Sequence, residues 1–457
     1  MNSLYVATLL FFFTFSLLLV SVDGFDTTLN VSQILWSAEK SGIFLGSPSL
    51  VRCPLDGSIV ASFDLFGKAA SFGGTSRSIN NGETWSIPVT GGLSQMYWAT
   101  LFTRTSVIST DLSVYAMGVT GDNSRGAAQI VIARSLDCGL TWSQSSNLTT
   151  GTNAYSTGPT PVLLTKDGRL WRAYERNDGA WASGYSVVVF SIPANATDLL
   201  LETDWSISGS LSFATVAPLV PSNWSIPGIV SNFGWLEGGA VETPDNSPGI
   251  NILLRVNSEP AANKAALVSL ATPDGMPTFV KWVDPFPGGN TKFTVRRDVQ
   301  TGLYVSLANN VNVTKLVSEP PTCGIANSTT TTTTTFSGSN INSSSSGMRT
   351  CCSTAQEVSC ASPITCLWCH ANARNVLTLS VSHDLAEWTI VGEPILEDDT
   401  GFQLWSSELF TGFQYVDWQF DGSDIIASVR AAYRGANAYH NSNRHLFLRL
   451  TDWRSIL

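Results

Sequence analysis

An eight-residue pattern occurs twice in this chain and limits what the chain can fold into. The clearer copy is SLDCGLTWS, which begins at Ser135, and an earlier copy, SINNGETWS, begins at Ser78. In this pattern the acidic or amide side chain can accept hydrogen bonds from turn N–H groups, the glycine can adopt positive φ, and the tryptophan can cover the turn. The pattern therefore predicts a tight hairpin turn that the fold uses more than once.

Weaker copies of the same tryptophan follow along the chain. Taken in order, the six positions are Trp85, Trp142, Trp205, Trp282, Trp388 and Trp453. Their spacing is similar throughout, except for the longer interval from Trp282 to Trp388, which contains an insertion. Between these positions lie short β-branched and aromatic runs bounded by Gly or Asp turns, such as AAQIVIARSLDCGLTW, while helical periodicity is scarce. A recurring unit long enough for four strands predicts an all-β, six-bladed β-propeller, and five or seven blades are the alternatives.

The N-terminal segment has the composition of a secretory signal. Residues 4–20 are almost uninterruptedly apolar and precede Val22-Asp23-Gly24, which predicts a signal peptide over residues 1–24. A retained signal anchor is the alternative, because no Lys or Arg flanks the run. No second span of about 20 apolar residues follows. We therefore expect a secreted, monomeric protein with no stable membrane span after cleavage.

Glycosylation sequons are consistent with the secretory route. They begin at Asn30, Asn147, Asn195, Asn223, Asn312, Asn327 and Asn342. Each one predicts an exposed turn if it carries a glycan.

The expected domain, residues 25–457, is interrupted by an insertion at about residues 316–372. This segment contains the low-complexity run NSTTTTTTTFSGSNINSSSSG and six of the eight cysteines, whereas Cys53 and Cys138 lie in the body. In an oxidising compartment such a cluster favours disulfides. CLWCH, residues 366–370, also has the spacing of a haem attachment site, and Cys-x-x-Cys can be redox-active or bind zinc. Disulfides are the preferred interpretation, so we expect no cofactor and no metal.

Charge and aromatic content narrow the class of partner. The net charge is −10 and no Lys/Arg cluster is present, which argues against nucleic acid as a partner. Fifteen tryptophans supply core contacts and also flat surfaces on which sugar rings can stack. Core and turn packing should account for most of these tryptophans, and the remainder could stack on a carbohydrate partner.

SLDCGLTW resembles the Asp-box, the repeat of the sialidase superfamily of six-bladed propellers, and SINNGETW differs from it by one substitution. The resemblance covers residues 36–450 apart from the insertion and implies a secreted sialidase-like protein. Because Asp-boxes lie on turns away from the active centre and also occur in non-enzymatic propellers, function is argued separately from fold.

The resemblance implies a set of catalytic side chains. Sialidases use a tyrosine nucleophile made more basic by a glutamate, an aspartate acid/base, and three arginines that bind the substrate carboxylate. Here Glu237 in NFGWLEGGAV, Tyr415 in GFQYVDWQFD and Asp64 in ASFDLFG match those roles. Arg255 in LLRVNS comes after Glu237 along the chain, much as the second arginine does in the family. The alternatives are an exposed carboxylate, a packing tyrosine and a turn aspartate.

Other polar residues are candidates for substrate binding. Strand alternation allows only one of Arg296 and Arg297 to face inward, and we choose Arg297; the same rule puts Asp417 on the face of Tyr415. Further candidates are Arg172, Glu175, His440 and Asn443.

One departure from the family changes the expected substrate. Sialidases open with Arg-Ile-Pro, whereas this chain reads LGSPSLVR with no arginine before Pro48. A missing arginine weakens carboxylate binding, so a neutral or differently charged sugar suits the site better. We expect an exo-acting, retaining glycoside hydrolase, with sialic acid among the candidate sugars. The alternatives are a polysaccharide lyase that uses Tyr415 or His440 as its base, and a non-catalytic sugar-binding propeller.

Overall fold

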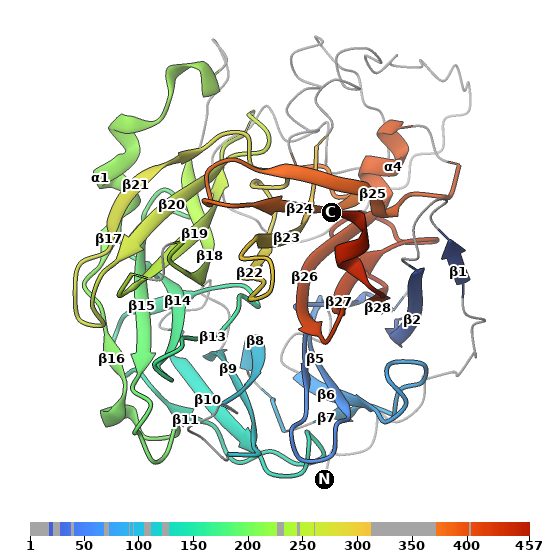
Figure 1. Ribbon diagram of the computed structural model, residues 1–457, viewed down its shortest axis with the longest axis horizontal. Helices are drawn as coiled ribbons and strands as arrows, with labels where there is room; N and C mark the ends of the chain where they lie inside the picture. Colours follow the sequence, from blue (N-terminus) through green and yellow to red (C-terminus); the bar gives the residue numbers. More distant parts are fainter. Residues whose placement is uncertain are drawn as a thin grey trace, which may run out of the picture.

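The computed structural model is a ring of six β-sheets around a common centre (Figure 1), which confirms the predicted six-bladed propeller. The structure describes residues 18–21, 28–37, 41–67, 73–90, 92–94, 96–104, 111–120, 128–225, 233–244, 247–259, 261–311, 372–401 and 404–457. Apart from residues 18–21 and 372, the predicted signal peptide and the predicted insertion lie outside these ranges.

The first three blades follow one another along the chain. Blade 1 contains β3 (Ile43–Leu45), β4 (Ser49–Arg52), β5 (Ile59–Gly67), β6 (Gly73–Ser78) and β7 (Val89–Thr90). Blade 2 contains β8 (Met96–Thr103), β9 (Val114–Thr120), β10 (Ile130–Ser135) and β11 (Ser146–Asn147). Blade 3 contains β12 (Ala154–Ser156), β13 (Leu163–Leu164), β14 (Leu170–Asn177), β15 (Tyr185–Ile192), β16 (Ser206–Ile207) and β17 (Leu211–Ser212).

The last three blades complete the ring. Blade 4 contains β18 (Gly234–Glu242), β19 (Ile250–Asn257), β20 (Ala265–Leu270) and β21 (Thr278–Val283). Blade 5 contains β22 (Thr294–Arg297), β23 (Tyr304–Asn309), β24 (Val376–Ser382) and β25 (Thr389–Glu397). Blade 6 contains β26 (Gly412–Asp421), β27 (Asp424–Ala432) and β28 (Arg444–Leu450), and then β2 (Thr28–Trp36) and β1 (Leu18–Ser21) from the N-terminal end.

The ring closes through β2. This strand pairs antiparallel with β28, so the two ends of the described chain share one sheet. Thr28 and Thr451 reinforce the closure, because their hydroxyl groups lie 2.8 Å apart. Closing a propeller with a strand from each end of the chain leaves no blade incomplete.

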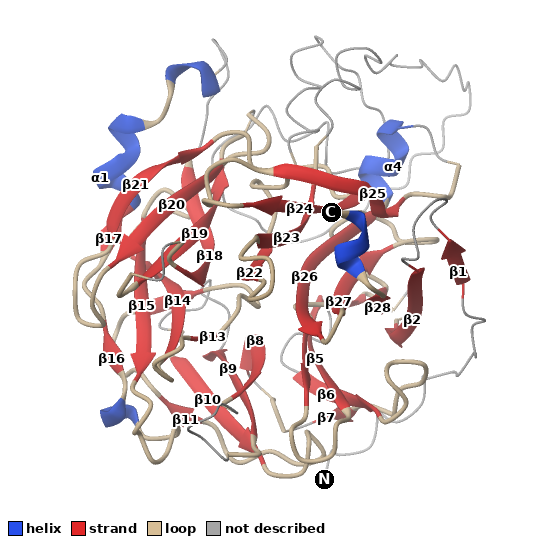
Figure 2. Ribbon diagram, in the orientation of Figure 1, coloured by secondary structure: helices blue, strands red, loops and turns tan. Residues whose placement is uncertain are grey.

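The helices are short (Figure 2). They are η2 (Glu202–Asp204), α1 (Phe213–Val216), η3 (Ala217–Leu219), η4 (Ser222–Trp224), α4 (Leu404–Phe410) and η5 (Trp453–Ile456). Among the described residues, no helix is both long and apolar enough to cross a membrane.

The apolar core is divided among the contacts between neighbouring blades. One cluster combines Val187 and Val189 of β15 with Ile252 and Leu254 of β19, so it joins blades 3 and 4. Other clusters occupy the remaining junctions in the same way. Strands in the middle of a blade therefore bury both faces, as β15 and β19 do along their whole lengths.

Both clear copies of the repeated pattern form the same turn. In one copy, Asp137 Oδ1 accepts hydrogen bonds from Thr141 N at 2.8 Å and from Ser135 Oγ at 2.8 Å, and Gly139 has φ of 80°. In the other copy, Asn80 Oδ1 accepts from the backbone N–H of Thr84 at 3.0 Å. These turns connect β10 to β11 in blade 2 and β6 to β7 in blade 1.

Four of the predicted sequons fall in described segments. Asn147, Asn195 and Asn223 are exposed, whereas Asn30 lies half-buried within β2. The other three sequons lie outside the described residues.

Candidate active site

Three of the strands that face the centre of the ring carry the same irregularity. The pairing register of β8, β18 and β26 shifts at a β-bulge in each strand. At these bulges Trp98, Glu237 and Tyr415 have φ of 53°, 44° and 56°. Within the described strands they are the only residues other than glycine with positive φ. Such backbone outliers and bulges concentrate at functional sites, so the centre of the ring is the candidate active site.

Two of these bulge residues contact each other. Tyr415 OH donates a hydrogen bond to Glu237 Oε1 at 2.6 Å, although 178 residues separate the two positions. The other carboxylate oxygen, Oε2, accepts from Arg255 Nη1 at 2.7 Å, and Arg255 Nε is held by Asn290 O at 2.8 Å. The predicted glutamate, tyrosine and second arginine thus form one hydrogen-bonded group.

The electrostatics of this group favour an ionised glutamate beside a neutral phenol. Burial opposes ionisation of Glu237, but the charge of Arg255 and the hydrogen bonds from Tyr415 and Arg255 bring its pKa below the usual value. Burial, followed by the charge of Glu237, raises the pKa of Tyr415. In the resting site the ionised Glu237 therefore accepts the hydrogen bond that the neutral phenol donates.

Two further arginines lie against the tyrosine. The guanidinium carbon of Arg430 lies 5.1 Å from the centre of the Tyr415 ring, and that of Arg374 lies 5.9 Å from it. Arg430 is fixed because its Nε donates to Ser442 Oγ at 3.0 Å and its Nη2 donates to His440 O at 2.6 Å. With Arg255, these side chains form a cluster of three arginines around the Tyr415–Glu237 pair.

Neither Arg374 nor Arg430 is among the residues predicted from the sequence. A usable signal exists for Arg430, since it is the single cation of β27, whose sequence DIIASVRAA is mostly apolar. Arg374 follows the predicted insertion and precedes β24, where the sequence pattern alone offers no distinguishing mark.

Asp64 is anchored at the junction of blades 1 and 2. Its Oδ1 accepts from Ser47 N at 2.6 Å and its Oδ2 accepts from Trp98 N at 2.9 Å. Burial raises the pKa of Asp64, although the two backbone N–H groups and the charge of Arg430 partly offset it. Ser47 belongs to the LGSPSLVR segment, which has no arginine before its proline, unlike the Arg-Ile-Pro segment of sialidases. In this protein a backbone N–H of that segment binds the Asp64 carboxyl group.

A second group of predicted residues is more deeply buried than Glu237 and Asp64. Arg172, Glu175 and Asp417 are 0%, 1% and 0% exposed, whereas Glu237 and Asp64 are each 7% exposed. Glu175 Oε1 accepts from Gly238 N at 2.8 Å, and burial raises its pKa to about 8. These side chains are sealed from solvent and connect the inner strands to one another.

The bulge in β26 separates Asp417 from Tyr415. Asp417 Oδ2 accepts from Ser49 Oγ of β4 at 2.6 Å, while the Tyr415 hydroxyl bonds to Glu237 of β18. Simple alternation predicts one shared face for residues two positions apart, but the extra residue of a bulge breaks that alternation.

Lys292, which is not among the predicted residues, holds the bulge of β26 through its side chain. Its Nζ donates to Val416 O at 2.7 Å and to Thr294 Oγ1 at 2.8 Å, and the side chain is 1% exposed. Burial lowers the pKa of Lys292 to about 7. Because Val416 follows Tyr415 directly, this contact helps to hold the tyrosine backbone in place.

The two neighbouring arginines of β22 point to different partners. Arg297 Nη2 donates to Pro244 O at 2.9 Å, in the segment after β18. Arg296 Nη2 instead lies 3.4 Å from Asp417 Oδ1 and so belongs with the buried layer.

The last two predicted residues differ in their surroundings. Both ends of the Asn443 amide are hydrogen-bonded to the backbone of Tyr433, at 3.1 and 3.0 Å, which gives Asn443 a structural role in the β27–β28 connection. His440 is exposed, and its ring centre lies 5.3 Å from that of Phe66. The surrounding protein, which displaces part of the water around the ring, and then the positive charge of Arg430 lower the pKa of His440.

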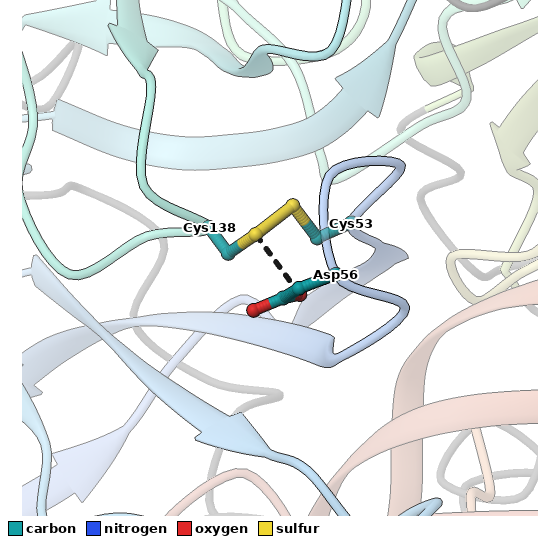
Figure 3. A group of neighbouring side chains, drawn as sticks. All are labelled: Cys53, Asp56 and Cys138. Carbon is teal, nitrogen blue, oxygen red and sulfur yellow. Dashed lines mark hydrogen bonds between the residues drawn. A yellow bond between two sulfur atoms is a disulfide. The ribbon is translucent and has the colours of Figure 1, made fainter.

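One group of described residues has the spacing of a metal site, away from the residues above. Cys53, Asp56 and Cys138 lie close together, with Asp56 Oδ1 3.1 Å from Cys138 Sγ (Figure 3). The two sulfur atoms, however, are joined in a disulfide. Since a thiolate is the metal-binding form of cysteine, this group does not fit a metal ion.

Comparisons with known proteins identify the fold. No protein-family model matches the chain, and no curated protein matches it. An α-L-arabinanase from Penicillium chrysogenum, solved with arabinobiose, aligns over 93% of this chain and 99% of its own, with 12% identity and a TM-score of 0.51. An α-L-arabinofuranosidase from Fusarium graminearum, solved as a mutant with an iminosugar inhibitor, aligns over 93% and 98%, with 9% identity and a TM-score of 0.52.

A sialidase gives a similar result. A mutant of the NanB sialidase from Streptococcus pneumoniae aligns over 93% of this chain and 71% of its own, with 12% identity and a TM-score of 0.51. Identities this low establish a shared sialidase-like propeller fold and no more.

Proposed function

We propose that this protein is a secreted, retaining exo-glycosidase that removes a terminal sugar from glycoconjugates. The observation that carries the proposal is the 2.6 Å hydrogen bond between Tyr415 OH and Glu237 Oε1, surrounded by three arginines. A tyrosine that shares its proton with an ionised carboxylate has the arrangement of an activated nucleophile.

The first half of the reaction breaks the glycosidic bond. Tyr415 Oη attacks the anomeric carbon while its proton passes to Glu237. Asp64, neutral because its pKa is raised, donates a proton to the departing oxygen. The leaving group departs as an alcohol, and the sugar stays bound to the tyrosine oxygen.

The second half releases the sugar. Asp64, now ionised, takes a proton from a water molecule that attacks the anomeric carbon. The tyrosine oxygen leaves and recovers its proton from Glu237, which restores the starting state. Two displacements at the same carbon retain its configuration.

The three arginines support an anionic substrate. Guanidinium groups bind carboxylates through paired hydrogen bonds, and Arg255, Arg374 and Arg430 all lie close to the reacting tyrosine. Arg430 offers the third positive charge that the LGSPSLVR segment lacks. A neutral nucleophile also suits a sugar with a carboxylate at its reacting carbon, because a carboxylate nucleophile would be repelled. A sialic acid-type sugar is therefore the proposed substrate.

Hydrolysis of a neutral sugar is the second candidate. Asp64 and Glu237 are the two carboxyl groups of the site: burial raises the pKa of Asp64, whereas the charge of Arg255 outweighs burial and lowers the pKa of Glu237. Two carboxyl groups with separated pKa values are the usual equipment of a glycosidase. The likeness to arabinan-degrading enzymes makes an arabinofuranoside the test substrate for this alternative.

A panel of fluorogenic glycosides tests both candidates. It contains an α-sialoside and an α-L-arabinofuranoside, and it is applied to the wild type and to Tyr415→Phe and Glu237→Gln. We expect sialoside turnover, with kcat reduced by about 10³-fold in both variants because each removes part of the nucleophile. Tyr433→Phe is the matched control, since its hydroxyl contacts Asp399 instead of the site, and it should retain activity.

Other outcomes are equally informative. Turnover of the arabinofuranoside alone, lost in Asp64→Asn and in Glu237→Gln, would favour the second candidate. A folded protein that cleaves no glycoside in the panel would refute the hydrolase proposal and favour a non-catalytic, sugar-binding propeller.

A further inference from the structure

Trp98 has the same place in blade 2 as the candidate catalytic residues have in blades 4 and 6. All three occupy the bulge of the strand that faces the centre of the ring, and all three have positive φ. An aromatic side chain in this conformation costs free energy, because its Cβ crowds the neighbouring carbonyl. The proposed mechanism gives Glu237 and Tyr415 a role at two of these strained positions. It gives no role to Trp98 at the third.

The backbone of Trp98 connects the two sides of the candidate site. Its N–H donates to Asp64 Oδ2 at 2.9 Å, and its carbonyl oxygen accepts from Arg172 Nη2 at 3.1 Å. Arg172 Nη2 also lies 3.3 Å from Gly158 O, and a Cβ added to Gly158 would lie 3.2 Å from Glu237 Cγ. Trp98 therefore stands beside the acid/base candidate, on the blade between Asp64 and the Glu237 side of the ring.

The indole of Trp98 differs from most others in the described chain. Nine other tryptophans donate their indole N–H to a protein oxygen. The Trp98 indole has no such partner among the described residues, and the side chain is only half-buried. Tyr97 is its ring neighbour, with the ring centres 6.5 Å apart. A half-buried indole with a free N–H offers a flat apolar face and a donor together, which is what one face of a sugar ring needs.

We propose that Trp98 binds the leaving-group sugar of the substrate by stacking its indole on that ring. The inference rests on the proposed function, because it uses the direction of the reaction. Asp64 protonates the departing oxygen, so the leaving group lies on the Asp64 side of the reacting carbon. Trp98 is the residue whose backbone N–H holds that carboxyl group, and its half-buried indole is the aromatic surface that we assign to the departing sugar.

Two substitutions at position 98 test the contribution of the indole ring separately from that of the backbone N–H. Trp98→Phe keeps an aromatic face, and Trp98→Leu removes it, while both leave a non-glycine residue at the strained φ and the N–H to Asp64. Trp181→Leu is the matched control, because Trp181 lies 51% exposed in the turn after β14. Each variant is assayed on an α-sialoside linked to lactose and on the corresponding sialosyl fluoride, which has no leaving-group sugar.

We expect Trp98→Leu to lower kcat/KM on the lactose-linked substrate by about tenfold or more and on the fluoride by less than about twofold. Trp98→Phe should recover most of the difference, and the control should resemble wild type on both substrates. Equal losses on both substrates would overturn the proposal, because they would mean that Trp98 acts through Asp64 or through folding. No loss on either substrate would also overturn it.

A separate measurement distinguishes this inference from the proposed function. If the wild type cleaves neither substrate, the function fails, and binding of lactose-linked sialoside is followed by saturation-transfer NMR. Signals from the lactose protons that are present in wild type and Trp98→Phe but lost in Trp98→Leu would support a stacking role without catalysis. Wild-type protein that shows no saturation of the lactose protons would overturn the inference as well.

Discussion

Asp64 shows how the surroundings of one residue decide its chemistry. The sequence ASFDLFG places an acidic residue near the end of a strand, where an ordinary exposed turn carboxylate is equally expected. In the folded chain that carboxyl is 7% exposed, bound to backbone N–H groups of Ser47 and Trp98, and raised in pKa by burial. Glu237 has the opposite shift, because Arg255 stabilises its ionised form. The neighbouring groups therefore favour a protonated Asp64 and an ionised Glu237, which suits the two carboxyl groups to different roles.

These opposite shifts predict the pH dependence of activity. The reactive form needs Asp64 protonated and Glu237 ionised, so kcat/KM should fall as pH rises through the raised pKa of Asp64. It should also fall as pH drops through the lowered pKa of Glu237. In Asp64→Asn, we expect kcat/KM on a glycan-linked substrate to be about 10²- to 10⁴-fold lower and the fall at high pH to disappear. Initial rates across pH test this, and an unchanged alkaline limb in Asp64→Asn would assign that limb to another group.

Gly46 is the residue most closely fitted to Asp64. A Cβ added at position 46 would lie 1.7 Å from Asp64 Oδ1, which no contact between real atoms allows. Gly46→Ala should therefore displace the carboxyl and reduce kcat/KM at least about tenfold, with a smaller effect on thermal stability. Gly179→Ala is the control, because its nearest neighbour would be 3.4 Å away. Full activity in Gly46→Ala would show that Asp64 need not occupy its present position.

At the scale of the element, the β-bulges bring the site together. Periodic alternation along β26 pairs Tyr415 with Asp417, yet the bulge sends the tyrosine hydroxyl to Glu237 and leaves Asp417 with Ser49. Bulges have no reliable mark in a single sequence, since they arise from pairing with the neighbouring strand. Residue types near the site were therefore predictable, and which of them share a face was not.

The repeated turn is an element whose behaviour the sequence does predict. Asp137 accepts three hydrogen bonds, from Thr141 N, Thr141 Oγ1 and Ser135 Oγ, and it lies on the turn between the third and fourth strands of blade 2. Asp137→Ala should lower the free energy of unfolding by about 1–3 kcal/mol without changing kcat/KM. Asp137→Asn places in this turn the residue that the other copy has at Asn80, and it should lower the free energy of unfolding by less than Asp137→Ala does. Denaturant unfolding and the glycoside assay measure both quantities, and loss of activity at native stability would contradict a purely structural role.

At the scale of the whole molecule, stability depends on contacts between successive blades. Each apolar cluster joins two neighbours, and β2 joins the last blade to the start of the chain. The disulfide between Cys53 and Cys138 adds a covalent link from blade 1 to blade 2 across 85 residues. Removing any one junction should weaken the whole ring, because no blade buries its apolar faces alone.

The disulfide provides a direct test of this dependence. Replacing both cysteines by serine should lower stability by about 2–5 kcal/mol, seen as a lower Tm at constant pH. Reductant should lower the Tm of the wild type toward that of the variant and leave the variant unchanged. Equal Tm values for oxidised wild type and variant would show that apolar contacts alone hold blades 1 and 2 together.

The amino-acid sequence by itself determined the repeat, the propeller architecture with six blades preferred over five or seven, and the residue types available for catalysis. Those features are written in local patterns: turn residues at fixed spacing, short β-branched runs, and recurring tryptophans. Only the tertiary structure decided which polar groups meet. Arg374, from the segment before β24, and Arg430, from β27, both approach Tyr415. Lys292, from the segment before β22, supports the bulge of β26, and Arg172 and Glu175 are buried. The physical reason is that the charge state of a side chain depends on burial and on partners remote in sequence, which ring closure alone brings into contact.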